Sequence, residues 1–169
     1  NKAVEKSHRK GSAQKRKMDD KIKNTSQPGV AYYHLPGLSE FYGLYRMFLP
    51  LFYHHREYFY NWCAIGSIYG ALGDCIWGGG RTSLGVQDPE DVMDLMREYG
   101  ISARLTFSNS LLREEHLADI KCNALCKLFE NSGGAQNGVI VHSDLLLRYL
   151  ESRYPGLYFV SSTTKVLTE

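Results

Sequence analysis

The chain has 169 residues, of which 43% are hydrophobic and 22% are charged. These proportions exclude an intrinsically disordered chain and supply enough apolar surface for the core of one globular domain. There is no run of about 18 consecutive apolar residues, and the first residues are basic rather than apolar, so we expect neither a membrane span nor a secretory signal. We therefore predict a cytoplasmic protein without a membrane partner.

The net charge of +2 conceals a basic N-terminal segment. Residues 1–24 contain nine Lys or Arg side chains and three acidic ones, whereas the rest of the chain is acidic. Because residues 1–30 have few apolar side chains, we expect them to form a flexible arm. The arm either keeps the protein soluble or binds nucleic acid or a nucleoprotein, since Lys and Arg release counterions from phosphates. The contacts of the second interpretation would come from Arg9, Lys10, Lys15, Arg16 and Lys17.

The four cysteines are Cys63, Cys75, Cys122 and Cys126. They are too few for a disulfide scaffold of this length and lack the CxxC spacing of a zinc site. We expect four reduced thiols and no metal site, and the sequence leaves the cofactor unknown.

Most of the aromatic side chains lie in residues 31–62, for which we predict helices. Ser39 is a suitable N-cap. Apolar side chains then recur at helical spacing at Phe41, Leu44, Tyr45 and Phe48. Pro50 should stop or kink this helix, and a second helix would run on through Phe59. Packing on the core is the favoured role, and stacking on bases or sugars, with the two histidines at 54–55 as acid–base groups, is the alternative.

From residue 63 onward, short apolar runs alternate with helical patterns. The predicted strands are 65–69, 102–107, 138–141 and 157–160. The predicted helices are 89–99, 114–131 and 145–154, the first of them opened by Asp88 and Pro89 and ended by Gly100. This alternation favours parallel strands with right-handed crossovers.

We therefore predict an α/β fold in which residues 63–169 form a partial TIM-type barrel of four βα units, half the number of a complete barrel. A half barrel leaves strand edges and its inner face uncovered. Three solutions stay open: the chain is the front half of a longer protein, a second chain completes the barrel, or the aromatic segment 31–62 covers the opening.

Ligands of parallel α/β folds bind at the carboxyl ends of the strands, and the residues there are our site candidates. The candidate ligand-binding residues after the first strand are Asp74, Trp77, Gly78, Gly79, Gly80 and Arg81. The glycines permit close backbone approach, and Arg81 suits a phosphate or carboxylate. The candidate catalytic residues are Asn109, which would orient a ligand, and His142, which would act as a general acid or base. Lys165, after the fourth strand, is a second cationic ligand group.

Each candidate also has a structural interpretation. The glycines can form a simple turn, because GGGR matches neither a Walker loop nor GxGxxG. His142 can help to start the next helix, with Ser143 or Asp144 as the cap. Cys75 has the position of a nucleophile, but the sequence identifies no base for it.

Three segments carry a family resemblance: SIYGALGDCIWGGGR, ISARLTFSNSLLREEHL, and NGVIVHSDLLLRYLESRYP followed by FVSSTTK. Over residues 58–169 the chain resembles the N-terminal half of uncharacterised clostridial barrel proteins, which are distantly similar to collagenase-like peptidases and to RNA-hydroxylation and quinone-hydroxylation proteins. The resemblance implies a bacterial protein related to eight-unit β/α barrels. Relatives carry a cysteine cluster in the C-terminal half that can hold an iron–sulfur centre, and this sequence does not include that half.

The leading functional hypothesis is a ligand-binding β/α-barrel domain of the collagenase-like peptidase and hydroxylation type, with no assigned reaction. The alternative is a small non-catalytic interaction module, such as a mobile-element inhibitor or regulator. It would bind nucleic acid or a nucleoprotein through residues 1–24 and the aromatic segment.

Overall fold

The structure is a computed structural model that describes residues 29–72, 75–79 and 88–165. The chain divides into two units, Asn1–Val30 and Ala31–Glu169. The description below concerns the second unit.

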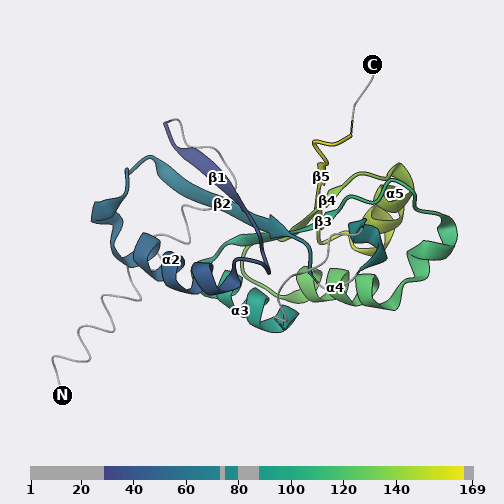
Figure 1. The fold of residues 1–169 in the computed structure, drawn as a ribbon, viewed down its shortest axis with the longest axis horizontal. Coiled ribbons are helices and arrows are strands. Elements are labelled where there is room, and N and C mark those ends of the chain that lie inside the picture. The colour runs from purple at the N-terminus through teal and green to yellow at the C-terminus, as the bar shows by residue number, and fades with distance from the viewer. Residues whose placement is uncertain (1–28, 73–74, 80–87, 166–169) are drawn as a thin grey trace. The chain divides into compact units, whose positions relative to one another are not determined.

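Five parallel strands form one sheet in sequential order, as Figure 1 shows. They are β1 (Ala31–Pro36), β2 (Cys63–Gly70), β3 (Ser102–Phe107), β4 (Gly138–Val141) and β5 (Tyr158–Ser161). The predicted α/β class and the parallel pairing are therefore confirmed, and the sheet fits a half barrel. The sheet has five strands, however, rather than the four predicted.

Four α-helices connect the strands within the described ranges. They are α2 (Tyr42–His54), α3 (Pro89–Tyr99), α4 (Ile120–Asn131) and α5 (Asp144–Arg153). Short 3-10 turns accompany them: η1 (Arg56–Tyr58), η2 (Ile76–Gly78) and η3 (Glu114–Ala118). Because each strand is added on the same side of the last, right-handed crossovers place the connecting helices on one face of the sheet. Helices α2, α3 and α4 lie together below the sheet in Figure 1.

Local sequence explains the ends of α3. The Asp88 side chain accepts a hydrogen bond from the Glu90 N–H at 2.9 Å, and Pro89 occupies the first turn, where its missing N–H costs nothing. Gly100 ends the helix in the left-handed conformation, with φ at +64°. The predicted boundaries of this helix are confirmed.

The core lies between the sheet and the helices. Alternate residues of β3 point into it, and Ala103, Leu105 and Phe107 are each at most 2% exposed. Val139 and Val141 of β4 continue this apolar surface, and the buried faces of the four helices cover it. The hydrophobic effect therefore acts mainly on one side of the sheet.

The prediction that residues 31–62 are helical was wrong at its start, where β1 pairs with β2. The helix in this segment begins at Tyr42, and Ser39 does not cap it. Pro50 lies inside α2 and does not stop it, although its nitrogen cannot donate a helical hydrogen bond. Leu49 and Phe52, on either side of Pro50, are buried, and their packing holds the helix together. No second α-helix follows in the described residues up to β2; the chain makes only the turn η1.

The predicted helix 114–131 is also divided. Residues 114–118 form η3, and α4 begins only at Ile120 because the Asp119 side chain accepts a hydrogen bond from the Cys122 N–H at 2.8 Å. Across the described ranges, no helix is both long and apolar enough to span a membrane.

The packing of β3 makes a direct prediction about stability. Replacing the fully buried Leu105 by alanine should lower the free energy of unfolding by about 2–5 kcal/mol, because it removes buried methyl groups and leaves a cavity. Leu111, which is 81% exposed, is the matched control, and its replacement by alanine should change stability by less than about 0.5 kcal/mol. Urea denaturation measures both, and equal effects would contradict this arrangement of the core.

Candidate functional site at the carboxyl edge of the sheet

Several predicted site residues lie outside the described part of the chain. They are Asp74, Gly80, Arg81 and the basic residues Arg9, Lys10, Lys15, Arg16 and Lys17. Their predicted roles therefore stay predictions. The other candidates, from Trp77 to Lys165, have defined positions.

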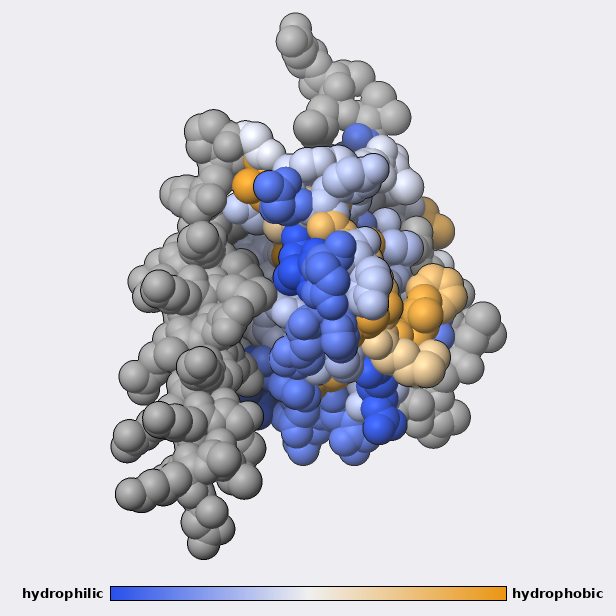
Figure 2. All heavy atoms as spheres, turned by 90° about the vertical axis from the view of Figure 1, so that its left-hand side faces the viewer, coloured by the Kyte–Doolittle hydropathy of each residue, from blue (hydrophilic) through white to orange (hydrophobic). Residues whose placement is uncertain are grey.

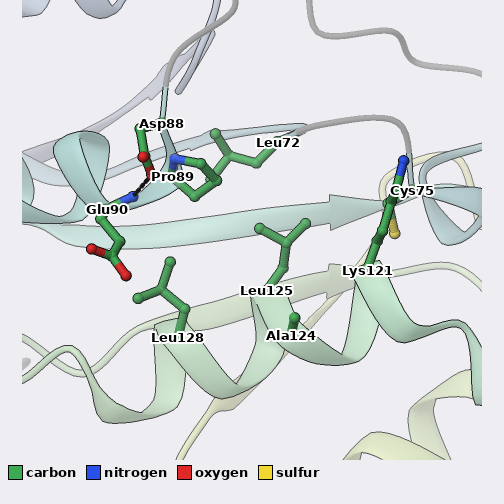
Figure 3. Close-up of a pocket in the computed structure, with 9 residues that line it drawn as sticks. All are labelled: Leu72, Cys75, Asp88, Pro89, Glu90, Lys121, Ala124, Leu125 and Leu128. Carbon is green, nitrogen blue, oxygen red and sulfur yellow. Dashed lines mark hydrogen bonds between the residues drawn. The ribbon is translucent and has the colours of Figure 1, made fainter.

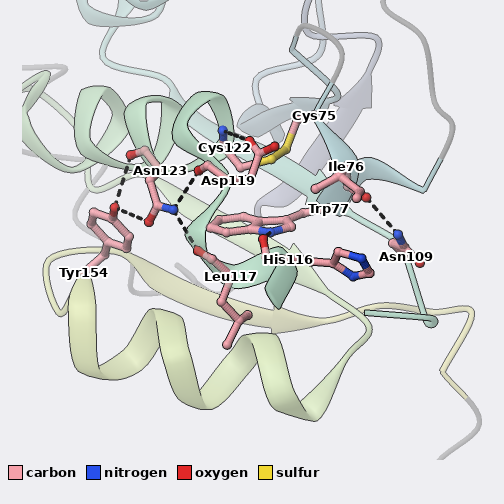
Figure 4. Close-up of a disulfide and its surroundings, with 10 residues drawn as sticks. All are labelled: Cys75, Ile76, Trp77, Asn109, His116, Leu117, Asp119, Cys122, Asn123 and Tyr154. Carbon is pink, nitrogen blue, oxygen red and sulfur yellow. Dashed lines mark hydrogen bonds between the residues drawn. A yellow bond between two sulfur atoms is a disulfide. The ribbon is translucent and has the colours of Figure 1, made fainter. Parts of the chain in front are cut away.

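Trp77 is a core residue, although it follows a strand end. Its side chain is 0% exposed, and its indole Nε1 donates a hydrogen bond to the His116 carbonyl oxygen at 2.7 Å (Figure 4). The ring packs edge-on against Phe107 and Tyr149. With no exposed surface and its polar atom already bonded, Trp77 cannot contact a ligand in this conformation.

Asn109 joins the end of β3 to the turn η2. Its side-chain amide donates to the Ile76 carbonyl at 2.8 Å, and its side-chain oxygen accepts from the Leu111 N–H at 2.9 Å. Gly79 packs closely against the backbone of Asn109, because a Cβ at position 79 would lie 3.0 Å from the Asn109 backbone nitrogen. The φ of Gly79, +70°, also favours glycine. This contact requires glycine at position 79, whereas Gly78 has open space around it. Both polar atoms of the Asn109 side chain are thus used to hold the loop.

His142 lies at the end of β4 and contacts the loop that follows β5. Its Nδ1 is 3.0 Å from the Thr164 hydroxyl, which is 2.8 Å from the Ser162 hydroxyl. Ser162 is only 6% exposed, so this short chain of hydrogen bonds runs from the surface into the edge of the sheet. The Nε2 atom of His142 has no hydrogen-bond partner among the described residues, which leaves it available to a ligand.

Lys165 lies close to the same group. Its ammonium group forms an ion pair with Asp144, the first residue of α5. The hydrogen bond from Lys165 and its positive charge hold the pKa of Asp144 below its ordinary value. Because Ser143 is the N-cap of α5 and accepts a bond from the Leu146 N–H, His142 is not needed as a cap. The structure therefore brings His142 and Lys165 to one edge, and it gives Asn109 a separate set of partners.

The prediction of four reduced thiols was wrong. Cys75 and Cys122 form a disulfide, with their Cα atoms 5.4 Å apart, and Figure 4 shows it between the η2 loop and the start of α4. Cys75 is therefore not a free nucleophile. Cys63 and Cys126 are free, and burial raises the pKa of Cys126 to about 12, so that thiol stays protonated. Disulfides are uncommon in the cytosol, so the disulfide gives no support to the cytoplasmic location, which stays a prediction.

A cavity of about 410 Å³ lies between the start of α3 and α4 (Figure 3). Its lining combines apolar side chains of α4, among them Leu125 and Leu128, with Asp88, Glu90 and Lys121. Residues 73–74, directly before Cys75, and residues 80–87, directly before Asp88, are outside the described ranges. We assign no ligand to this cavity.

The face of the sheet opposite the helices carries polar residues that the site prediction did not include. In β3, Ser102, Arg104 and Thr106 alternate with the core residues. The other strands contribute His34 of β1, Ser67 of β2 and Tyr158 of β5. A signal for these residues was present, because the sequence SARLTF alternates strictly between polar or small and apolar side chains, the pattern of a strand with one buried face. These residues lie within strands, whereas the predicted site residues lie at strand ends.

No group of three His, Cys, Asp or Glu side chains that could hold a metal occurs within residues 29–72, 75–79 and 88–165. Comparisons of the chain with protein-family models, with curated proteins and with solved structures found no match. The suspected family relationship stays a prediction, and the function is argued from the geometry.

The disulfide should contribute strongly to stability, because it closes a loop over a sequence separation of 47. By the loop-entropy relation, replacing Cys122 by serine should lower the free energy of unfolding by about 4 kcal/mol, measured by urea denaturation without reductant. Cys63→Ser is the control, since Cys63 is free, and its effect should stay below about 1 kcal/mol. Alkylation of four thiols in the wild-type chain unfolded in urea without reductant would contradict the disulfide, which predicts two.

Proposed function

We propose that the chain is a ligand-binding partial β/α-barrel domain whose ligand, a small polar molecule, binds at the carboxyl edge of β4 and β5. The observation that carries this proposal is the hydrogen-bonded group of His142, Thr164 and Ser162 beside Lys165. These residues come from two neighbouring strand ends, which is where parallel α/β proteins bind ligands.

The charges at this edge suit a polar ligand. His142 presents its Nε2 atom, and the ammonium group of Lys165 is held in place by Asp144. A ligand with a negatively charged oxygen could replace Asp144 as the partner of Lys165, because the Lys165–Asp144 ion pair is near the surface and therefore weak. Arg81 is proposed as an additional anion contact on the basis of its sequence position. No reaction is assigned, and relationship to the peptidase and hydroxylation proteins is part of the proposal.

A thermal-shift screen of the full chain against carboxylates, phosphates, sugars and nucleosides tests this function. We expect at least one class to raise the melting temperature, and we expect His142→Ala and Lys165→Ala to reduce that shift by removing ligand contacts. His55→Ala and Lys127→Ala are matched controls on exposed residues elsewhere. The proposal would be refuted if no compound raised the melting temperature, or if the shifts were unchanged in both His142→Ala and Lys165→Ala.

A second candidate function, a nucleic-acid interaction module, is favoured by one observation. Tyr60 and Trp62 stack with their ring centroids 5.2 Å apart and remain 71% and 40% exposed. Exposed aromatic rings can stack on the bases of single strands. Figure 2 shows that the described residues on the left-hand side of Figure 1 form a mostly hydrophilic surface with a smaller hydrophobic area.

Tryptophan fluorescence tests the second candidate. The chain has two tryptophans, and Trp77 is buried, so quenching by a single-stranded oligonucleotide should report on Trp62. Tyr60→Ala should weaken binding of the oligonucleotide by about 1–3 kcal/mol if the Tyr60 and Trp62 rings stack on a base. Leu111→Ala is the control at an exposed apolar position. Unchanged fluorescence at low salt would exclude this role for the pair.

A further inference from the structure

The open face of the sheet is organised in two neighbouring cross-strand rows. By strand register, one row contains His34, Ser67 and Ser102, and the other contains Tyr69, Arg104, Gly138 and Tyr158. The His34 Nδ1 atom and the Ser67 hydroxyl are 2.8 Å apart. Among the described residues of the five strands, Arg104 alone has a permanent positive charge, and its face is distinct from the carboxyl edge described above.

Gly138 allows the side chains of two non-adjacent strands to meet. A Cβ at Gly138 would lie 2.7 Å from the Tyr158 ring, so only glycine lets this ring cross β4. The Tyr158 hydroxyl thereby reaches the Ser102 hydroxyl, at 2.7 Å, and accepts a hydrogen bond from the Arg104 Nε atom. The Arg104 guanidinium lies over the same ring, 5.1 Å from its centroid. Tyr158 therefore holds the Arg104 guanidinium in place through its hydroxyl and its ring.

The remaining donors of Arg104 are unused. Its two Nη groups have no hydrogen-bond partner in the described residues, and none of the Asp or Glu side chains there is within ion-pair distance of it. A half-buried guanidinium held in one position but without a counterion is unusual, because arginine is costly to bury unpaired. The two free Nη groups form a fork that matches the two oxygens of a carboxylate or phosphate.

Thr106 provides an independent observation. It lies two residues after Arg104, on the same face of β3, and it is only 5% exposed. Its hydroxyl has no hydrogen-bond partner, although buried polar atoms are nearly always bonded. Because the Tyr158 hydroxyl accepts from Arg104, it can donate its own hydrogen to Ser102, and the Ser102 hydrogen is then also free. Residues with an unused donor thus flank Arg104 on both sides along β3.

We propose that this open face binds a small oxyanion, the phosphate or carboxylate group of a small molecule, with Arg104 as its charge partner and with Thr106 and Ser102 as additional donors. His34 borders the site as a neutral group. Burial, followed by the charge of Arg104, holds the pKa of His34 below its ordinary value. A bound anion offsets the charge of Arg104 and therefore raises the pKa of His34, which gives the site a second readout.

Titration of the full chain with inorganic phosphate and with acetate, at constant ionic strength, tests the proposal and distinguishes the two oxyanions. We expect calorimetry to give a dissociation constant on the order of 1 mM for the preferred anion. Arg104→Gln should weaken binding at least about tenfold. Arg104→Lys should bind more weakly than the wild type, because it keeps the charge and loses the fork. Arg46→Gln, at an exposed position of α2, also removes one positive charge and should have no effect on anion binding.

Thr106→Val separates binding from folding. Valine has nearly the same shape and removes a buried hydroxyl that has no partner, so the substitution should leave the stability unchanged or increase it. It should nevertheless weaken anion binding several-fold. An NMR titration should also show that the pKa of His34 rises when the anion is present.

Three results would overturn the proposal. They are a wild-type chain that binds neither anion, equal binding by the wild type and Arg104→Gln, and equal binding by the Arg and Lys forms, which would indicate nonspecific attraction. If the wild type binds neither anion, a carboxylate of another polypeptide becomes the alternative partner of Arg104. His142→Ala should leave anion binding unchanged, so failure of this proposal is distinguishable from failure of the carboxyl-edge function.

Discussion

The sequential parallel pairing of β1 to β5 is the constraint on which the rest of the structure depends. Each parallel pair needs a crossover connection, and right-handed crossovers that always add a strand on the same side return along the same face. One face of the sheet is therefore covered by helices and contains the core. The other face receives no helix from these crossovers, and it can carry polar side chains without loss of core packing.

The same pairing brings distant residues together at the carboxyl edge. His142 and Thr164 are 22 positions apart in the sequence, yet they are in contact because β4 and β5 end side by side. At the other side of this edge, Trp77 and the Cys75–Cys122 disulfide fasten the η2 loop to the core and to α4. The edge thus consists of a closed, structural part around Asn109 and a part around His142 that is available for binding.

Much of the architecture could be predicted from local sequence. The helix α3 is marked by Asp88, Pro89 and Gly100, and β3 and β4 were predicted with their observed boundaries, because strong local signals coincide with the tertiary packing there. The strand β1 could not be predicted in this way. It is an edge strand with an exposed and irregular pattern, and it ends in proline, so its identity depends on pairing with β2.

The site was predictable only in part, for similar reasons. The position of Trp77 after a strand suggested ligand contact, but a single 3-10 turn directs its side chain into the core. The partner of Cys75 is 47 positions away, and no local pattern identifies it. The alternation of β3 indicates that Ser102, Arg104 and Thr106 share the polar face, but the contact of Arg104 with Tyr158 of β5 passes over Gly138, and only the strand register reveals it.

The central claim is that one face of the sheet is packed and the other is open. Thiol labelling of two adjacent positions in β3 tests it most directly, in a Cys63→Ser background that removes the more accessible free thiol. The structure predicts that a cysteine replacing Ser102, on the open face, reacts readily, and that one replacing the fully buried Ala103 is protected. Protection of both positions, or faster reaction at position 103, would contradict the account.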